Sequence, residues 1–88
     1  MMNQFVEIGK VFDVYPDVIV ILAKNPKGDE YRLPIHIDPA INFNDIRENI
    51  HFGSIVGLKG YIVHNYGETI CYATKISILK YIKRHENC

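Results

Sequence analysis

The stretch VEIGKVFDVYPD, residues 6–17, decides the fold together with its counterpart GSIVGLKGYIV, residues 53–63, in the second half of the chain. In both stretches a glycine interrupts an apolar, alternating pattern: Gly9 precedes a lysine in the first, and Gly60 precedes a tyrosine in the second. A glycine inside a strand weakens it and usually marks a bulge or a tight bend. Gly9 and Gly60 therefore predict two bends, and two bends in so short a chain predict a small, strongly curved barrel.

The length of the chain, 88 residues, predicts one domain spanning residues 1–88. A chain of this size buries roughly 60% of its unfolded surface, which limits it to one compact core. No apolar stretch reaches the ~20 residues of a membrane helix, and the N-terminus has no secretory signal pattern. The two cysteines, Cys71 and Cys88, are too few for a disulfide framework. We therefore expect a cytoplasmic protein in a reduced environment, with no membrane association.

The net charge of the chain is zero, because it contains ten basic and ten acidic residues. A strongly electrostatic DNA-binding domain would usually have a pI above about 9, so the composition argues against that class. The distribution is uneven, since residues 38–48 are mainly acidic and residues 80–88 are mainly basic.

Five segments have the alternation or the β-branched content of strands: residues 5–14, 18–24, 31–37, 54–64 and 69–79. Pro34 interrupts the third segment and predicts an edge position or a bulge there. Residues 41–53 are the one helical candidate, which Asn42 or Asn44 can cap and Gly53 can end. The order is three strands, a short helix and two strands. This all-β order predicts a five-stranded oligonucleotide/oligosaccharide-binding (OB) barrel, with an SH3-like barrel as the nearest rival.

The faces of the last two predicted strands suggest a binding surface. Period-two alternation places Lys59 and Tyr61 outward on the fourth strand and Lys75 outward on the fifth, whereas Tyr72 shares its parity with isoleucines and is predicted to be core. Bases stack on aromatic rings and lysines contact phosphates, so this surface suits single-stranded nucleic acid. The same pattern equally fits a solvent-exposed face with lysines for solubility and a tyrosine for cross-strand packing.

Three motifs, FVEIGKVFDVYPD, FGSIVGLKGYIV and YATKISIL, resemble in this order the first, fourth and last strands of the bacterial single-stranded DNA-binding proteins. The resemblance implies an OB fold and sequence-independent binding of single-stranded DNA in replication, recombination or repair. It also implies a homo-oligomer, either a dimer or a tetramer. Ending at KRHENC, the chain resembles a short form that lacks the flexible acidic C-terminal tail of the family.

The resemblance also implies binding residues, by position: Lys10 after the first glycine, Tyr31 in the third strand and Tyr66 in the last hairpin. Tyr31 shares its parity with apolar residues unless a bulge at Pro34 changes its face. The chain departs from the family in having no tryptophan and in carrying Tyr61 where a basic residue is usual. With the outward residues, the predicted set that contacts DNA, or RNA in its place, is Lys10, Lys24, Tyr31, Lys59, Tyr61, Tyr66 and Lys75.

Catalytic and metal-binding patterns are missing from the sequence. It contains no CxxC, no HxxxH and no glycine-rich phosphate loop. His85 and Cys88 are a terminal pair, and Cys71, which could face His64 across the hairpin, fits better as a small packing residue. We therefore expect no enzyme activity, no cofactor and no metal.

An alternative function is an OB-fold module for protein interaction or oligomerisation, without direct nucleic-acid binding. In it the outward aromatics would bury into a partner protein or a second copy, and the zero net charge favours it. A nucleic-acid binder should have its lysines along one groove. An interaction module should instead have an apolar patch, such as one formed by Ile55, Tyr61 and Val63.

Overall fold

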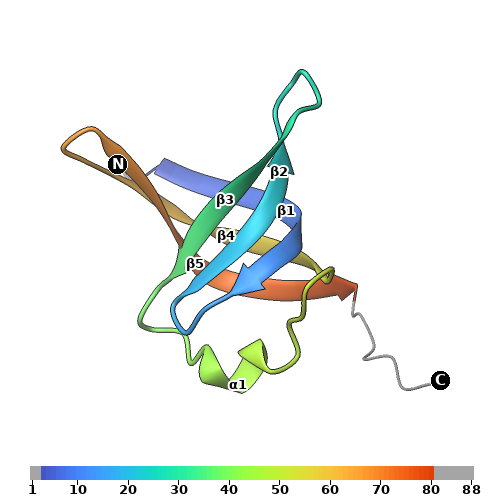
Figure 1. The fold of residues 1–88 in the computed structure, drawn as a ribbon. Coiled ribbons are helices and arrows are strands. Elements are labelled where there is room, and N and C mark those ends of the chain that lie inside the picture. Colours follow the sequence, from blue (N-terminus) through green and yellow to red (C-terminus); the bar gives the residue numbers. More distant parts are fainter. Residues whose placement is uncertain (1–2, 81–88) are drawn as a thin grey trace.

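A computed structural model describes residues 3–80 of the chain, which form five strands and one short helix (Figure 1). In chain order these are β1 (Asn3–Val14), β2 (Val18–Lys24), β3 (Glu30–Ile37), α1 (Asn44–Arg47), β4 (Ile55–Asn65) and β5 (Glu68–Lys80). The strands close into a barrel in the order β1-β2-β3-β5-β4. The predicted all-β class, the five-stranded barrel and the helix between the third and fourth strands are confirmed.

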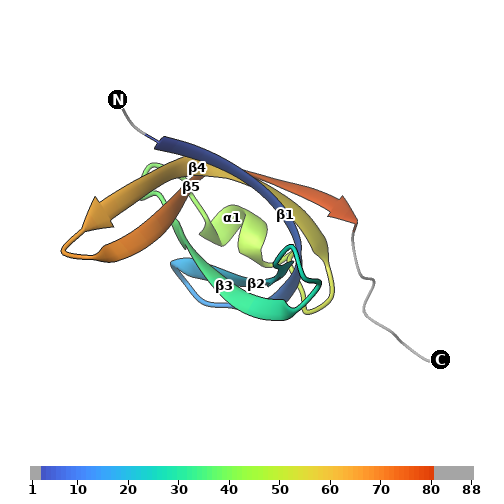
Figure 2. The same ribbon diagram turned by 90° about the horizontal axis from the view of Figure 1, so that it is seen from above.

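The barrel has two sides and two projecting hairpins. β4 and β5 lie on one side, β2 and β3 lie on the other, and α1 lies across one end (Figures 1 and 2). The β2–β3 and β4–β5 hairpins both extend beyond the closed part of the barrel (Figure 1). Neighbouring strands are antiparallel except β3 and β5, which pair in parallel at two positions, His36 with Tyr72 and Ile37 with Ala73. We call this contact the seam.

The interior is apolar and follows the predicted alternation on most strands. On β2, Ile19 and Ile21 are fully buried, and on β4 Val56 and Leu58 are equally inaccessible. The core cluster comprises Phe5, Val11, Ile19, Ile21, Ile35, Ile37, Phe43, Ile50, Val56, Leu58 and Ala73. No helix among residues 3–80 is long and apolar enough to cross a membrane.

The alternation predicted for β5 fails at Thr74. The β4–β5 ladder pairs Lys59 with Lys75 and Gly60 with Ala73, so Thr74 is an extra residue in a bulge. Because of this extra residue, the inward and outward positions of β5 before Thr74 are the reverse of those predicted, and Ala73 is fully buried. The prediction that Tyr72 is a core residue is therefore wrong, because Tyr72 lies on the opposite face from Ala73.

The two glycines of the decisive stretches have different roles. Gly60 lies at the register shift of β4, where a Cβ would overlap the carbonyl of Tyr72, so the predicted irregularity is confirmed. Gly9 pairs regularly with Val56, and the shift in β1 comes later, at Phe12. A Cβ on Gly9 would lie 2.8 Å from Cδ1 of Ile21, so this glycine permits close packing rather than a bulge.

The helix is shorter than the predicted span of residues 41–53, because α1 covers only Asn44–Arg47. Phe43 occupies its N-cap position and no side chain makes a capping hydrogen bond, so the predicted asparagine caps are wrong. Phe43 and Ile50, which flank the helix, are buried and fill this end of the barrel. Gly53 has a φ of +94° and turns the chain into β4, several residues after the helix has ended.

The third strand confirms the edge position of Pro34. Pro34 pairs with Val20 in a regular β2–β3 ladder, whereas β3 pairs with β5 only at its last two residues. Because there is no bulge at Pro34, Tyr31 keeps the parity of the core residues Ile35 and Ile37. Its side chain is nevertheless 46% exposed, and it lies in the part of β3 that does not pair with β5.

Candidate nucleic-acid interface

Three rings form a row across the seam on the outer surface. The rings of Tyr61 and Tyr72, directly opposite each other on β4 and β5, are stacked with centroids 5.4 Å apart and an 18° interplanar angle. The ring of His36 on β3 lies 5.5 Å from that of Tyr72 at 43°. All three residues are half-buried. We call His36, Tyr61 and Tyr72 the seam cluster.

A hydrogen bond to Asp38 orients the ring of Tyr61, which is the member of the seam cluster on β4. The hydroxyl of Tyr61 donates to Oδ2 of Asp38 at 2.7 Å, and the backbone N–H of Ala40 donates to Oδ1 of the same carboxylate at 2.8 Å. The bond from Ala40, followed by that from Tyr61, lowers the pKa of Asp38 below its usual value of 3.8. The same bond to Asp38 raises the pKa of Tyr61 above 10.0. Tyr61 is therefore a neutral, fixed ring at physiological pH.

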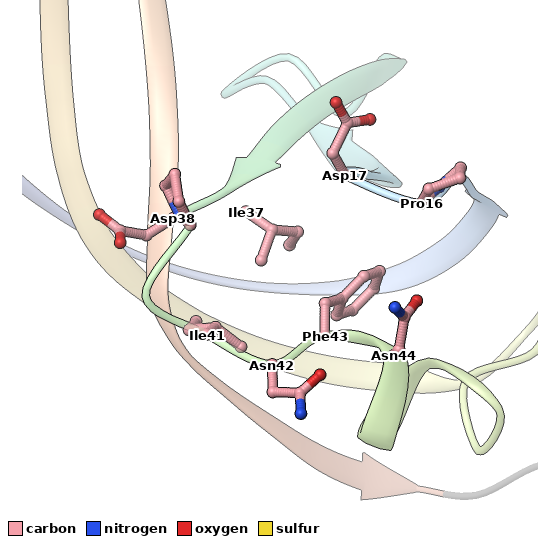
Figure 3. A pocket seen from close by; sticks show the side chains of 9 residues that line it. Pro16, Asp17, Ile37, Asp38, Ile41, Asn42, Phe43 and Asn44 are labelled. Carbon is pink, nitrogen blue, oxygen red and sulfur yellow. The ribbon is translucent and has the colours of Figure 1, made fainter.

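A depression beside Asp38 has the wrong charge for phosphate. Its volume is about 180 Å³, and it lies between the β1–β2 turn and the β3–α1 connection (Figure 3). Asp17 and Asp38 are on its rim, and their carboxylates point away from each other (Figure 3). None of its lining residues carries a positive charge: Pro16, Asp17, Ile37, Asp38, Pro39, Ile41, Asn42, Phe43 and Asn44. This depression therefore offers no cationic side chain for a phosphate.

The structure places two of the predicted lysines together on β4 and β5. Lys59 and Lys75 are exposed and directly opposite each other in the ladder. They border a shallow depression of about 250 Å³ that also contains three exposed apolar side chains, Val6, Ile8 and Leu79. Ile55, Tyr61 and Val63, the patch named for an interaction module, are each half-buried.

The other predicted residues are distributed over β1 and the two hairpins. Lys24 and Tyr31 lie on neighbouring strands of the β2–β3 hairpin, and both are exposed. Tyr66 is at the tip of the β4–β5 hairpin, 99% exposed, with a φ of +50°. Lys10 is exposed on β1, in the row that joins Ile55 to Leu22. The seven residues surround the barrel and do not form one groove, since β4 and β5 lie across the barrel from β2 (Figure 2). Lys83, Arg84, His85 and Cys88, noted in the sequence, lie outside the described residues.

Sequence reasoning missed two members of the seam cluster. Tyr72 was assigned to the core because the bulge at Thr74 has no signature in the residue pattern. His36 is not among the predicted site residues, although its parity on β3 is opposite to that of the buried Ile35 and Ile37. Among residues 3–80, no three histidine, cysteine or acidic side chains come together as a metal site.

Comparisons with known proteins agree on the architecture. No protein-family profile and no curated protein sequence matches the chain. Among solved structures, the mitochondrial single-stranded DNA-binding protein Rim1 from S. cerevisiae is similar, with a TM-score of 0.76 and 17% identity over 96% of this chain and 100% of that chain. The N-terminal domain of PriB from Thermoanaerobacter tencongensis, described as dimeric, has a TM-score of 0.62 and 20% identity over 88% and 96%.

A third similar structure is the Stn1–Ten1 complex of S. pombe, in which the matched chain has a TM-score of 0.60 and 17% identity. The match covers 90% of this chain and 59% of that one. Identities of this size establish the fold alone. Together with the closed barrel of five strands and the helix between β3 and β4, they establish that this chain has the OB fold.

Proposed function

We propose that this protein is a short relative of the bacterial single-stranded DNA-binding proteins and binds single-stranded DNA without sequence preference. The observation that carries the proposal is a set of outward rings on an OB barrel: the seam cluster, with exposed Tyr31 and Tyr66 on the two hairpins beside it. Bases of any sequence stack on such rings, at about 1–3 kcal/mol each. Rim1, whose fold is similar, is itself a single-stranded DNA-binding protein.

The lysines supply phosphate contacts around these rings. Lys24 and Tyr31 both lie on the β2–β3 hairpin, on opposite faces of its ladder, and the Lys59–Lys75 pair continues the outer face of β4 and β5 beyond Tyr61. The strand would therefore wrap around the barrel across the seam instead of lying in one groove. Such binding protects single strands that are exposed during DNA replication, recombination or repair, and we place the protein in the cytoplasm.

The test is a titration of the full chain with fluorescently labelled oligo-dT at ~50 mM and ~200 mM salt. We expect saturable binding that weakens as salt rises, because bound lysines release counterions from phosphates. A duplex of the same length should bind more weakly, since its bases cannot stack on the rings, and oligo-rU distinguishes RNA from DNA. Absence of oligo-dT binding at the lower salt concentration contradicts the proposal.

A pair of substitutions at Tyr66 tests the stacking contribution. Tyr66→Asn removes the ring and keeps a residue that tolerates positive φ, and we expect affinity to fall about 5- to 150-fold. Tyr66→Phe keeps the ring and should bind like the wild type. Equal affinities of the two variants would show that the hairpin tip does not stack on a base.

A second candidate function is self-association, which the exposed patch of Val6, Ile8 and Leu79 favours. Clustered apolar side chains on an otherwise polar surface mark contact sites, and the similar PriB domain is described as dimeric. We propose a dimer or tetramer formed through this patch. Ile8→Lys should lower the mass measured by light scattering, whereas Ile8→Val should not. A protein that assembles in this way and does not bind oligo-dT would be an interaction module.

A further inference from the structure

A second aromatic cluster lies outside the seam cluster, and its position begins with the backbone of β1. The β1–β2 ladder shifts register between Val11 and Asp13, so Phe12 is the extra residue of a bulge. The N–H of Val11 donates to the carbonyl of Ser54 at 2.7 Å, and the N–H of Gly53 donates to the carbonyl of Val11 at 2.9 Å. These two bonds fix the turn before β4 against the bulge.

The turn brings a second ring beside the first. Phe52 and Phe12 have ring centroids 5.9 Å apart with an interplanar angle of 58°. Phe52 is 66% exposed. The guanidinium carbon of Arg32, an exposed residue of β3, lies 4.1 Å from the centroid of the Phe12 ring. β1, β3 and the turn before β4 thus contribute two rings and one planar cation to one place on the surface.

We propose that Phe12, Phe52 and Arg32, together called the Phe12 site, bind a nucleobase of single-stranded DNA and the phosphate next to it. The base stacks on the exposed ring of Phe52, and the guanidinium of Arg32 contacts the phosphate while its face stays on Phe12. The proposal rests on the proposed function and extends it to residues that the family resemblance does not include. Base stacking and the planar guanidinium are both tolerant of sequence.

The surroundings of the Phe12 site favour a polyanion over an apolar partner. Lys10 and Arg32 belong to one row of paired residues across β1, β2 and β3, with the half-buried Leu22 between them. His36 of the seam cluster has the same parity on β3, about 13 Å further along at ~3.3 Å per residue. A strand bound across the outer edge of β3 could therefore contact both aromatic clusters.

The nearest carboxylate on the same strand is already engaged. Asp13, which follows Phe12, accepts hydrogen bonds from the hydroxyl of Tyr15 at 2.8 Å and from the backbone N–H of Val14 at 2.9 Å. Both of its oxygens thus accept local hydrogen bonds, whereas Arg32 lies against the face of an aromatic ring. Within residues 3–80, no hydrogen bond to another side chain occupies the N–H donors of Arg32.

The absence of tryptophan from the sequence makes a direct test possible. Phe52→Trp keeps a ring in the site and introduces the only tryptophan of the chain, whose emission can be excited separately from that of the six tyrosines. We expect its emission to be quenched by oligo-dT, with the same midpoint as binding followed by labelled DNA. A complex that forms normally and leaves this emission unchanged overturns the proposal.

A second reporter separates this proposal from the proposed function. Tyr66→Trp, made in a separate protein, reports on the hairpin tip. Quenching at position 66 without quenching at position 52 rejects the Phe12 site alone. If neither variant nor the wild type binds oligo-dT, the proposed function fails and the Phe12 site fails with it.

Further substitutions distinguish binding from structure. Phe52→Ala should weaken oligo-dT binding about 5- to 150-fold, whereas Phe52→Tyr should not, and the thermal midpoint should change little because the ring is exposed. Arg32→Gln should also lower the slope of log affinity against log salt by about 0.7. Arg32→Lys should restore that slope. A loss of thermal stability with an unchanged slope would show that Arg32 only supports the fold.

Discussion

Gly60 shows how one missing side chain sets the course of two strands. A Cβ there would overlap the carbonyl of Tyr72 and lie 2.9 Å from the Cα of Ala73. The close approach occurs beside the bulge at Thr74, which turns Ala73 inward and Tyr72 outward. The seam cluster therefore depends on a glycine whose own backbone torsions are ordinary.

Gly60→Ala should destabilise the protein by about 3 kcal/mol, the upper end of the range for overpacking, because backbone and not a flexible side chain must move. Gly57→Ala is the matched control on the same strand, since its Cβ would meet only Cδ1 of Leu79 at 3.6 Å and Cγ of Leu79 at 3.9 Å. Urea unfolding at equilibrium measures both. Equal free energies of unfolding would contradict the close approach at Gly60.

The bond between Tyr61 and Asp38 predicts a titration. Tyr61→Phe removes the hydroxyl, so the pKa of Asp38 should rise but remain below 3.8, because the larger contribution from the Ala40 N–H remains. NMR titration of the Asp38 carboxyl carbon measures this change. An identical midpoint in wild type and variant would show that the hydroxyl does not bind the carboxylate.

The same bond has a defined effect on stability against pH. The pKa of Asp38 is lowered by folding, so its contribution is present above pH 3.8 and is lost as pH falls through the folded-state value. The pKa of Tyr61 is raised, so its contribution is present below pH 10.0 and is lost as pH rises through the folded-state value. The difference in free energy of unfolding between wild type and Tyr61→Phe should therefore become smaller both at low pH and at high pH.

At the scale of elements, neighbouring strands differ in the number of residues that they pair. The β4–β5 ladder has eleven residue pairs, whereas the β3–β5 seam has two. Local opening occurs where few hydrogen bonds must break. The amide of Asp38, which donates to the carbonyl of Ala73 across the seam, should exchange with deuterium faster than the amides in the middle of β4. Equal protection of these amides would contradict a weak seam.

The sequence predicted elements well where apolar alternation is uninterrupted, and poorly where backbone irregularities intervene. The bounds of β2 were predicted correctly, because a β-branched run lies between two clusters of turn formers. The reversal of β5 at Thr74 was missed, since a bulge depends on the partner strand. The helix was predicted too long, because Phe43 and Ile50 fill the barrel end from irregular backbone around it.

At the scale of the whole molecule, the net charge is zero, but acidic and basic side chains are unevenly distributed over the surface. Acidic side chains line the depression at one end, whereas Lys59 and Lys75 lie together on β4 and β5. Of the residues proposed to contact DNA, outward parity predicted Lys59, Tyr61 and Lys75, whereas the family resemblance supplied Lys10, Tyr31 and Tyr66. Their distribution around the barrel was not predictable from the sequence, since it depends on which strands become neighbours on closure.

A strand that wraps around the barrel should contact both lysines of this pair. Lys59→Gln combined with Lys75→Gln should lower the salt slope of oligo-dT binding by about 1.4, or ~0.7 for each phosphate that is no longer neutralised. Lys27→Gln, in the β2–β3 loop outside the predicted set, serves as the control. An unchanged slope in the double variant, with an altered mass in solution, would assign this face to self-association.

The two parallel pairs of the seam also bear on the order of folding. Three of the four antiparallel ladders join strands that are neighbours in sequence, and the fourth, between β1 and β4, has eight residue pairs. His36 and Tyr72 are distant in the chain, so bringing them together has an entropic cost of loop closure. The two residue pairs of the seam provide few hydrogen bonds to offset that cost. We therefore expect the hairpins to form first, β1 to join them next, and the circle of strands to be completed in the last kinetic step.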